Sequence, residues 1–221
     1  MELAERVVSL LRTGGWVMWP LLLLSLASVT LTFERTAFWL STHRPRRLRR
    51  IESVMSLARA GKLSAAASRA EADGSVYGRY MRALLDHAVS RPREAASMAE
   101  SYAHEQAERL RPPIERFGST MATIVTAAPM LGILGTVTGI IRSFRLLGDE
   151  GVVTDPTTVA AGIGEALFTT AFGLIIALVT IFPHAAFRAQ SERCLSRFEV
   201  IAATIVEATR RQNAETDAGG K

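Results

Sequence analysis

Cysteine is almost absent from this sequence, because Cys194 is the only one. One cysteine cannot form a disulfide within the chain or build a cysteine-based metal site. We therefore expect Cys194 to be a small apolar residue in a packed interior. The four histidines, His43, His87, His104 and His184, are scattered, and no catalytic triad, phosphate-binding loop or metal-ligand spacing accompanies them. The sequence therefore predicts no enzyme and no bound cofactor or metal.

Charged side chains are missing from three long stretches of the sequence, 16–33, 117–141 and 166–187. A helix rises about 1.5 Å per residue, so each stretch can cross, or nearly cross, a hydrocarbon core of about 30 Å. A buried helix of a soluble protein is the alternative for any one stretch, but three together favour a membrane protein. With Glu165 at the start of the third helix, the predicted spans are 16–33, 117–141 and 165–187.

Arginine supplies most of the net charge of +5, and its distribution indicates the orientation of the spans. Basic residues concentrate on the cytoplasmic side of membrane proteins. Arginines follow the first span, and Arg188, Arg193 and Arg197 follow the third, so both of these sides are predicted to be cytoplasmic. The N-terminal segment 1–15 and the short loop 142–164 are then predicted to be periplasmic. The arginines after the first span are Arg35, Arg44, Arg46, Arg47, Arg49 and Arg50.

The beginning of the chain carries two glutamates, and no small-residue cleavage pattern precedes the first apolar run. We therefore expect no removable signal peptide. No basic stretch is interleaved with aromatic residues or placed on a nucleic-acid-binding module, so nucleic acid is not a predicted partner. The run from Arg44 to Arg50 is instead expected to lie against anionic membrane lipids, with a contribution of about 1 kcal/mol per basic residue.

Residues 34–116, between the first two spans, show apolar residues at helical spacing. Three helical segments are expected, over 51–72, 77–90 and 93–111. The predicted interruptions are Gly61, Gly74, Gly78 and the Arg91–Pro92 step. We therefore predict an all-α membrane protein with three transmembrane helices, a helical cytoplasmic domain formed by long extensions of the membrane helices, and a cytoplasmic tail at 188–221. The charged faces of this domain are expected to be solvated, and a specific docking role is the alternative.

The second and third spans are rich in glycine and threonine rather than leucine. Gly135 and Gly139 are four residues apart, and Gly132 and Gly173 occupy similar small-residue steps. Such faces let helix backbones approach closely in lipid, where no hydrophobic force between helices assists their association. These four glycines are therefore predicted to mediate helix packing.

Polar groups at membrane depth need a partner or water, so those of the two spans are candidates for an ion pathway. They are Thr136, Thr169 and Thr170, with Glu165 at the outer start of the third span. The alternative for each threonine is a hydrogen bond to the carbonyl three or four residues earlier. The alternative for Glu165 is a first-turn glutamate at the positive end of the helix dipole. No Asp, Glu, Lys or Arg lies near the middle of any span, so a proton path requires a carboxylate from another chain.

Two sequence runs, APMLGILGTVTGIIRSF in the second span and GIGEALFTTAFGLIIAL in the third, resemble the MotA/TolQ/ExbB proton-channel family. The pairing of the two runs is specific, and the similarity is closest to the TolQ/ExbB branch. This branch resembles the chain in its length, its three spans and its large cytoplasmic loop. The resemblance covers most of the chain, with the specific motifs between about Ala128 and Ala177.

The resemblance implies an inner-membrane homopentamer in which these helices surround a central pore. It places Thr136 and Thr170 toward the pore and Glu165 near its outer mouth. It also implies two copies of a single-span ExbD/TolR-like subunit, whose transmembrane aspartate lies inside the pore and takes up and releases protons. Two departures from the family pattern stand out. Pro112–Pro113 falls where the family usually has an uninterrupted helix, and Pro183 lies later in the third span than the corresponding proline.

Two functions are consistent with these features. The first is a pore-forming subunit of a proton-driven motor that performs work on the outer membrane or cell envelope. The second is an oligomeric membrane scaffold without ion conduction, in which the glycine and threonine faces serve only assembly. Removal of threonine hydroxyls is expected to abolish the first function and to leave the second intact. A transporter is disfavoured, since three spans without an internal repeat or a charged midplane site leave little room for a substrate.

Overall fold

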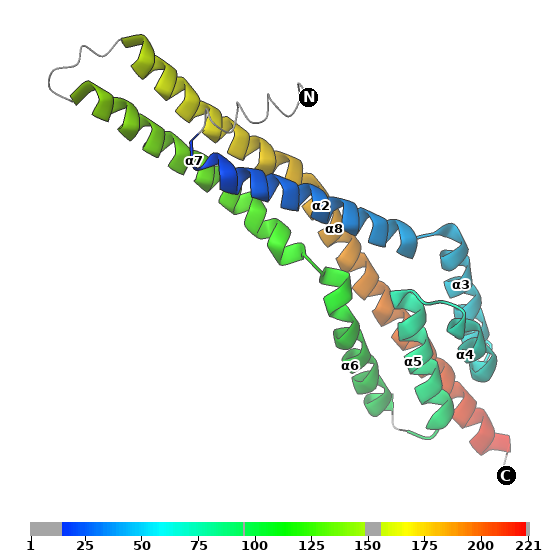
Figure 1. The fold of residues 1–221 in the computed structure, drawn as a ribbon. Coiled ribbons are helices and arrows are strands. Elements are labelled where there is room, and N and C mark those ends of the chain that lie inside the picture. Colours follow the sequence, from blue (N-terminus) through cyan, green and yellow to red (C-terminus); the bar gives the residue numbers. More distant parts are fainter. Residues whose placement is uncertain (1–14, 95, 149–155, 220–221) are drawn as a thin grey trace. The chain divides into compact units, whose positions relative to one another are not determined.

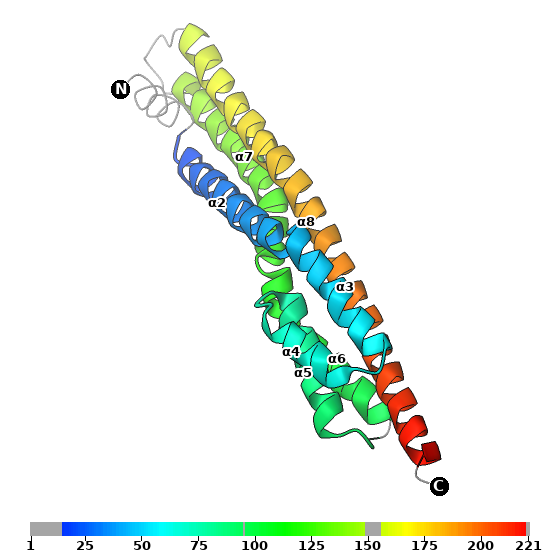
Figure 2. The same cartoon turned by 90° about the vertical axis from the view of Figure 1, so that its right-hand side faces the viewer.

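The computed structural model describes residues 15–94, 96–148 and 156–219, and these residues are almost entirely helical (Figures 1 and 2). No β-strand occurs within these ranges, and the all-α fold class predicted from the sequence is confirmed. The helices are α2 (Met18–Thr42), α3 (Pro45–Arg59), α4 (Leu63–Glu71), α5 (Val76–Ser90), α6 (Ala96–Glu115), α7 (Gly118–Gly148) and α8 (Pro156–Gly219).

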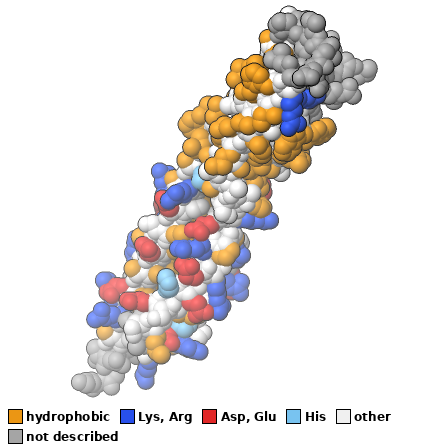
Figure 3. Space-filling model, turned by 90° about the vertical axis from the view of Figure 1, so that its left-hand side faces the viewer, with side chains coloured by type: hydrophobic (Ala, Val, Ile, Leu, Met, Phe, Trp, Pro, Cys, Tyr) orange, Lys and Arg blue, Asp and Glu red, His pale blue; other side chains and the backbone are white. Residues whose placement is uncertain are grey.

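Three of the described helices, α2, α7 and α8, are long and apolar enough to cross a membrane. Their most apolar windows have mean hydropathies of 1.4, 1.9 and 2.2. Large apolar side chains point outward from each of them, including Phe33 (72% exposed), Met130 (69%) and Phe182 (70%). Figure 3 shows hydrophobic side chains gathered over the membrane helices on the visible face, with few charged side chains among them. Such a surface suits lipid rather than water, so the chain is a multi-pass membrane protein.

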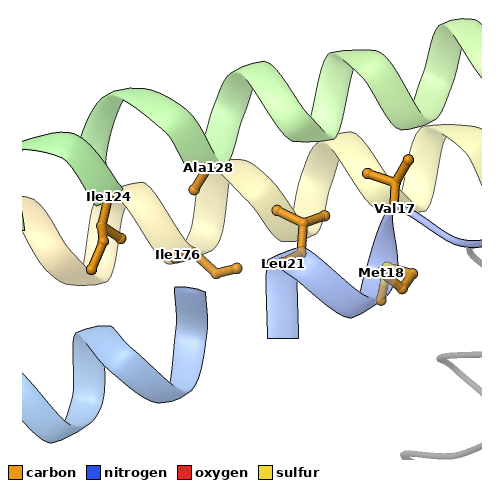
Figure 4. Close-up of a cluster of buried hydrophobic side chains, with 6 residues drawn as sticks. All are labelled: Val17, Met18, Leu21, Ile124, Ala128 and Ile176. Atoms are coloured by element: carbon orange, nitrogen blue, oxygen red, sulfur yellow. The ribbon is translucent and has the colours of Figure 1, made fainter. Parts of the chain in front are cut away.

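The chain forms two compact units. The first, here the membrane unit, contains the described residues up to Arg35 together with Phe117–Phe187. Its apolar cluster joins all three membrane helices (Figure 4). The buried members are Val17, Met18 and Leu21 near the start of α2, Ile124 and Ala128 of α7, and Ile176 of α8. Because α2 contributes half of this cluster, its N-terminal turns are anchored on the other two helices.

The second unit, here the polar unit, contains Thr36–Arg116 and the part of α8 from Arg188 onward. Its core is aromatic, since Phe198 of α8 stacks on Tyr80 at 4.1 Å and meets the edge of Tyr77 at 5.8 Å. The Tyr80 hydroxyl donates a hydrogen bond to the Ala103 carbonyl at 3.2 Å, which ties α5 to α6. Cys194 is fully buried beside this cluster, as its expected role as an apolar filler requires.

The breaks predicted from the sequence within the polar unit are present in the structure except at one glycine, and a further break, between α2 and α3, was not predicted. Gly61 has a φ of +73° and separates α3 from α4. Gly74 lies between α4 and α5. Gly78, however, lies inside α5, so its prediction as a break is wrong. A side-chain carbon at this position would collide with the backbone oxygen of Asp73, so the close approach of the preceding turn requires glycine there.

The entry into the second membrane helix is interrupted, but not at the two prolines. Pro112 and Pro113 lie within the last turns of α6. The break follows at Phe117, whose φ of 64° falls in the left-handed region that non-glycine residues seldom adopt. The helix before the second span is therefore separate from it, whereas α8 continues unbroken through Pro183 into the polar unit.

Candidate functional site between α7 and α8

The α7 and α8 backbones approach closely because glycines line the face of α7 that meets α8. Figures 1 and 2 both show the two helices side by side. A side-chain carbon built on Gly132 would lie 2.9 Å from the Thr170 Cα, and one built on Gly139 would lie 2.6 Å from the Ala166 Cβ. Neither position has room for any larger residue unless the helices move apart.

The other two glycines of the predicted packing set lie in the same contact. A side-chain carbon on Gly135 would collide with the side chain of Thr169. One on Gly173 of α8 would collide with the Ala128 carbonyl of α7, so the small face is reciprocal. All four glycines therefore face the partner helix of the same chain, and the surface they form is filled within one copy of the protein.

This close packing brings Thr136 and Thr170 together. Their hydroxyl groups are hydrogen bonded to each other. The Thr136 hydroxyl also lies 3.1 Å from the Gly132 carbonyl oxygen, and the Thr170 hydroxyl lies 3.0 Å from the same oxygen. Each hydroxyl has one proton and more than one acceptor within reach, so the pair can exchange donor and acceptor roles without movement of the backbone.

Thr169 lies deeper in the contact between the helices. Its side chain is 1% exposed and packs against Gly135. The hydroxyl can donate to Ala166 O at 2.7 Å or to Gly132 O at 3.2 Å. Within a single chain, this position gives Thr169 the geometry of a packing residue that is satisfied by backbone carbonyls.

Glu165 has a different environment from the one that its position in the sequence suggests. Helix α8 begins at Pro156, so Glu165 is not in the first turn and the interpretation as a helix-dipole partner is wrong. Its side chain is exposed. Thr170 lies five residues further along α8, about 7 Å in axial rise. Among the described contacts, none joins Glu165 to the threonine pair.

The helix segments that carry the two threonines are neutral. The sequence contains no Asp, Glu, Lys or Arg from Phe117 to Ile141 or from Ala166 to Phe187. Threonine hydroxyls can donate and accept hydrogen bonds but do not titrate in the physiological range. The pair formed by Thr136 and Thr170 therefore offers hydrogen-bond donors and acceptors but no titrating group.

One further hydrogen bond and one further close approach lie within the membrane unit, and sequence reasoning did not identify them. The hydroxyls of Ser28 in α2 and Thr180 in α8 are 2.6 Å apart, and both residues are buried. Ser143 of α7 lies against Gly162 of α8, where a side-chain carbon would collide with the serine hydroxyl. Small polar residues in apolar spans are the only sequence signal, and that signal does not reveal which residues pair.

Sequence comparisons identify relatives of this chain. Residues 73–200 match the sequence model described as the MotA/TolQ/ExbB proton channel family. An ExbB-like biopolymer transport protein of Synechocystis is 36% identical over 170 residues, which cover 76% of this chain and 65% of that protein. The chain thus spans about two thirds of the length of this relative. The Tol-Pal system protein TolQ of Pseudomonas aeruginosa is 40% identical over 82 residues, covering 37% of this chain and 35% of TolQ.

A solved structure shares the fold. The structure titled C. jejuni MotAB superimposes with a TM-score of 0.60 and 19% sequence identity, covering 86% of this chain and 73% of that chain. The matched family region includes both glycine and threonine runs that line the contact between α7 and α8. The family resemblance inferred from these runs is confirmed, and the chain belongs to the MotA/TolQ/ExbB proton channel family.

Proposed function

We propose that this protein is the pore-forming subunit of a proton-driven motor of the ExbB/TolQ type in the bacterial inner membrane. The observation that carries the proposal is the hydroxyl pair of Thr136 and Thr170, which lies on a glycine-packed helix pair without titratable groups. The glycine contacts hold the two hydroxyls at a fixed separation from the Gly132 carbonyl. A water molecule or a protonated group beside the two threonines can therefore form hydrogen bonds with oxygen atoms that are already oriented.

The motor needs a second subunit, because this site cannot bind and release a proton by itself. A single-span ExbD/TolR-like partner with a transmembrane aspartate supplies the missing carboxylate. The threonine hydroxyls then donate hydrogen bonds to the ionised aspartate and accept one from its protonated form. Two partner copies inside a pentamer of this chain form the complete assembly. The outward apolar faces of α7 and α8, which include Met130, Ile133 and Leu178, are available to lipid and neighbouring copies.

The arginine distribution supports an orientation with the N-terminus in the periplasm and the polar unit and C-terminus in the cytoplasm. In this orientation Glu165 lies on the outer side of the threonine pair. Its exposed carboxylate attracts cations toward the outer end of the path. Protons then pass from the periplasm to the cytoplasm, and the partner subunits convert their passage into work on the cell envelope.

Removal of the hydroxyls tests the pore assignment. Thr136→Val and Thr170→Val keep the approximate shape of the side chains but remove the hydrogen-bonding groups. In proteoliposomes that contain this chain and its partner, we expect each variant to reduce proton flux at least tenfold. Thr126→Val is the matched control, because Thr126 is exposed on α7 and bonded to carbonyls of its own helix.

The same experiment separates the motor from the scaffold. Full flux and full envelope function in both Thr136→Val and Thr170→Val would refute the pore assignment. An assembled complex without detectable flux in any form of the protein would instead favour the scaffold. Bulky substitutions at Gly135 or Gly139 do not distinguish the two functions, because both glycines already contact α8 within the chain.

A further inference from the structure

The arginines at the start of α3 have two different environments. Arg47 lies 3.8 Å from the buried carboxylate of Asp73, and Arg50 donates a hydrogen bond to the Ala72 carbonyl. Asp73 also accepts a hydrogen bond from the Ser75 backbone at 2.9 Å. Arg47 and Arg50 therefore hold the turn between α4 and α5, and their charge is used inside the polar unit.

The other three arginines of this run, Arg44, Arg46 and Arg49, are exposed. Among the described residues, no carboxylate forms an ion pair with any of them. Arg46 and Arg49 are three residues apart and share one side of α3. Arg44 immediately precedes the first residue of the helix. The sequence thus concentrates three available positive charges within six residues.

The position of these charges along the chain matches the edge of a bilayer. From the exposed Trp19, a helix needs about 20 residues to cross a core of about 30 Å, and this length ends near Trp39. Leu40, in the last turns of α2, is 69% exposed. Arg44 follows four residues after Leu40, just past the end of α2. An exposed leucine followed closely in the sequence by exposed arginines is typical of a surface that contacts acyl chains and headgroups together.

We propose that Arg44, Arg46 and Arg49 form a binding surface for the phosphate groups of anionic phospholipids in the leaflet on the side of the polar unit. Arg47 and Arg50 do not belong to this surface. The proposal rests on the proposed membrane orientation only for the statement that this leaflet is cytoplasmic. A guanidinium group binds phosphate oxygens through paired hydrogen bonds, so this surface distinguishes an anionic headgroup from a zwitterionic one.

Lipid titration of the full-length protein in neutral detergent, read by native mass spectrometry, tests this surface. The probes are phosphatidylglycerol and phosphatidylcholine with identical acyl chains. We expect the wild type to bind phosphatidylglycerol more tightly than phosphatidylcholine. The triple variant R44Q/R46Q/R49Q is expected to bind phosphatidylglycerol about a hundredfold more weakly than the wild type, and so to lose this preference. Raised salt is expected to weaken the wild-type preference and to have little effect on the variant.

A matched control removes the same charge elsewhere. Arg59, Arg93 and Arg210 are exposed and without a described ion pair, and Arg59 lies at the opposite end of α3. The variant R59Q/R93Q/R210Q is expected to keep the wild-type preference. R47Q is expected to keep it as well, but to unfold at a lower temperature because Asp73 loses its cation. These results separate lipid binding from net charge and from folding.

Three outcomes would overturn the proposal. The first is a preference in R44Q/R46Q/R49Q within threefold of wild type, with an unchanged unfolding temperature. The second is an equal loss in R59Q/R93Q/R210Q, which indicates a general charge effect. The third is equally tight binding of glycerol phosphate, which has no acyl chains and indicates a site for free phosphate. Because the assay omits the partner subunit and proton flux, its failure leaves the motor proposal to be judged by the threonine variants.

Discussion

At the scale of single residues, the packing of the membrane unit depends on glycines, which have no side chain, as much as on residues with large side chains. The contact at Gly173 involves the backbone oxygen of Ala128, which no side-chain rotation can displace. The contact at Gly162 of the same helix involves mainly the Ser143 hydroxyl, which can rotate away. Glycines at the contact between α7 and α8 are therefore expected to differ in their tolerance of substitution, according to the atom that each one meets.

Gly173→Ala is expected to destabilise the membrane unit by about 1–3 kcal/mol, because the added methyl group overpacks a rigid contact. Gly164→Ala is the control on the same helix, since nothing lies within 4 Å of a side-chain carbon there. The control is expected to be neutral or slightly stabilising, because alanine favours helix over glycine. Unfolding in detergent, followed by circular dichroism, measures both, and equal effects would contradict this interpretation.

His43 is expected to make the polar unit sensitive to acid. It stacks on Trp39, and burial together with the nearby Arg197 lowers its pKa below the ordinary value of 6.5. The unfolded chain therefore binds this proton first as the pH falls. The contribution of neutral His43 to the stability of the polar unit is therefore complete above pH 6.5. It is lost progressively as the pH drops from 6.5 toward the lowered pKa of His43 in the folded protein. Unfolding temperatures at pH 7.5 and pH 5.5 measure the loss, and His43→Gln is expected to reduce it.

At the scale of helices, the charge-free stretches were sufficient to predict the three membrane helices, because a span needs a minimum length of apolar residues regardless of its neighbours. The breaks at Gly61 and Gly74 were also predictable from local chemistry. The role of Gly78 was not, because it depends on the backbone of Asp73 folding back onto α5. The start of α8 at Pro156 was hidden because the residues before Glu165 include two threonines and two glycines, which are poor helix formers.

The candidate site shows the same division between local and tertiary information. The family resemblance pointed to Thr136 and Thr170, but the shared acceptor at the Gly132 carbonyl follows only from the way α7 and α8 cross. The pairing of Ser28 with Thr180 spans most of the chain and leaves no periodic signal. Contacts of this kind are set by the relative placement of helices, which hydrophobic patterning does not encode.

The Ser28 and Thr180 contact is expected to stabilise the position of α2 on α8 by a modest amount. Hydrogen bonds between membrane helices contribute about 0.6 kcal/mol on average. A double-mutant cycle with Ser28→Ala and Thr180→Val is therefore expected to give a coupling energy near that value. Thr30→Val is the control, because Thr30 is exposed and donates to the Leu26 carbonyl of its own helix. A coupling energy of zero would show that the two hydroxyls act independently.

At the scale of the whole molecule, the reactivity of the buried Cys194 thiol can be used to measure how often the polar unit opens. Burial raises the pKa of this thiol to about 11, and burial also raises the pKa of Tyr80 to about 12. The unfolded chain releases these protons earlier, from about pH 9 for the thiol, so stability falls as the pH rises above that point. No other cysteine competes for a labelling reagent.

Alkylation of Cys194 at pH 8 is expected to be slow and limited by opening of the polar unit. The rate should increase in variants that weaken the aromatic core, such as Tyr80→Ala, which removes the stacked partner of Phe198. Thr126→Val, in the membrane unit, is expected to leave the rate unchanged. Mass spectrometry of the labelled protein follows the reaction, and rapid labelling of the wild type would contradict the burial of the thiol.

The glycine-lined face of α7 is occupied by α8 of the same chain, and this has a consequence for cells that produce several related motor proteins. In the proposed assembly, the residues that fold one copy are separate from the exposed residues on the outward faces of α7 and α8 that would meet other copies. Changes on the outward faces can therefore alter which chains assemble together without weakening the helix pair or the hydroxyl site. By this route duplicated genes can diverge into complexes that do not mix, while each protein keeps the same hydroxyl pair.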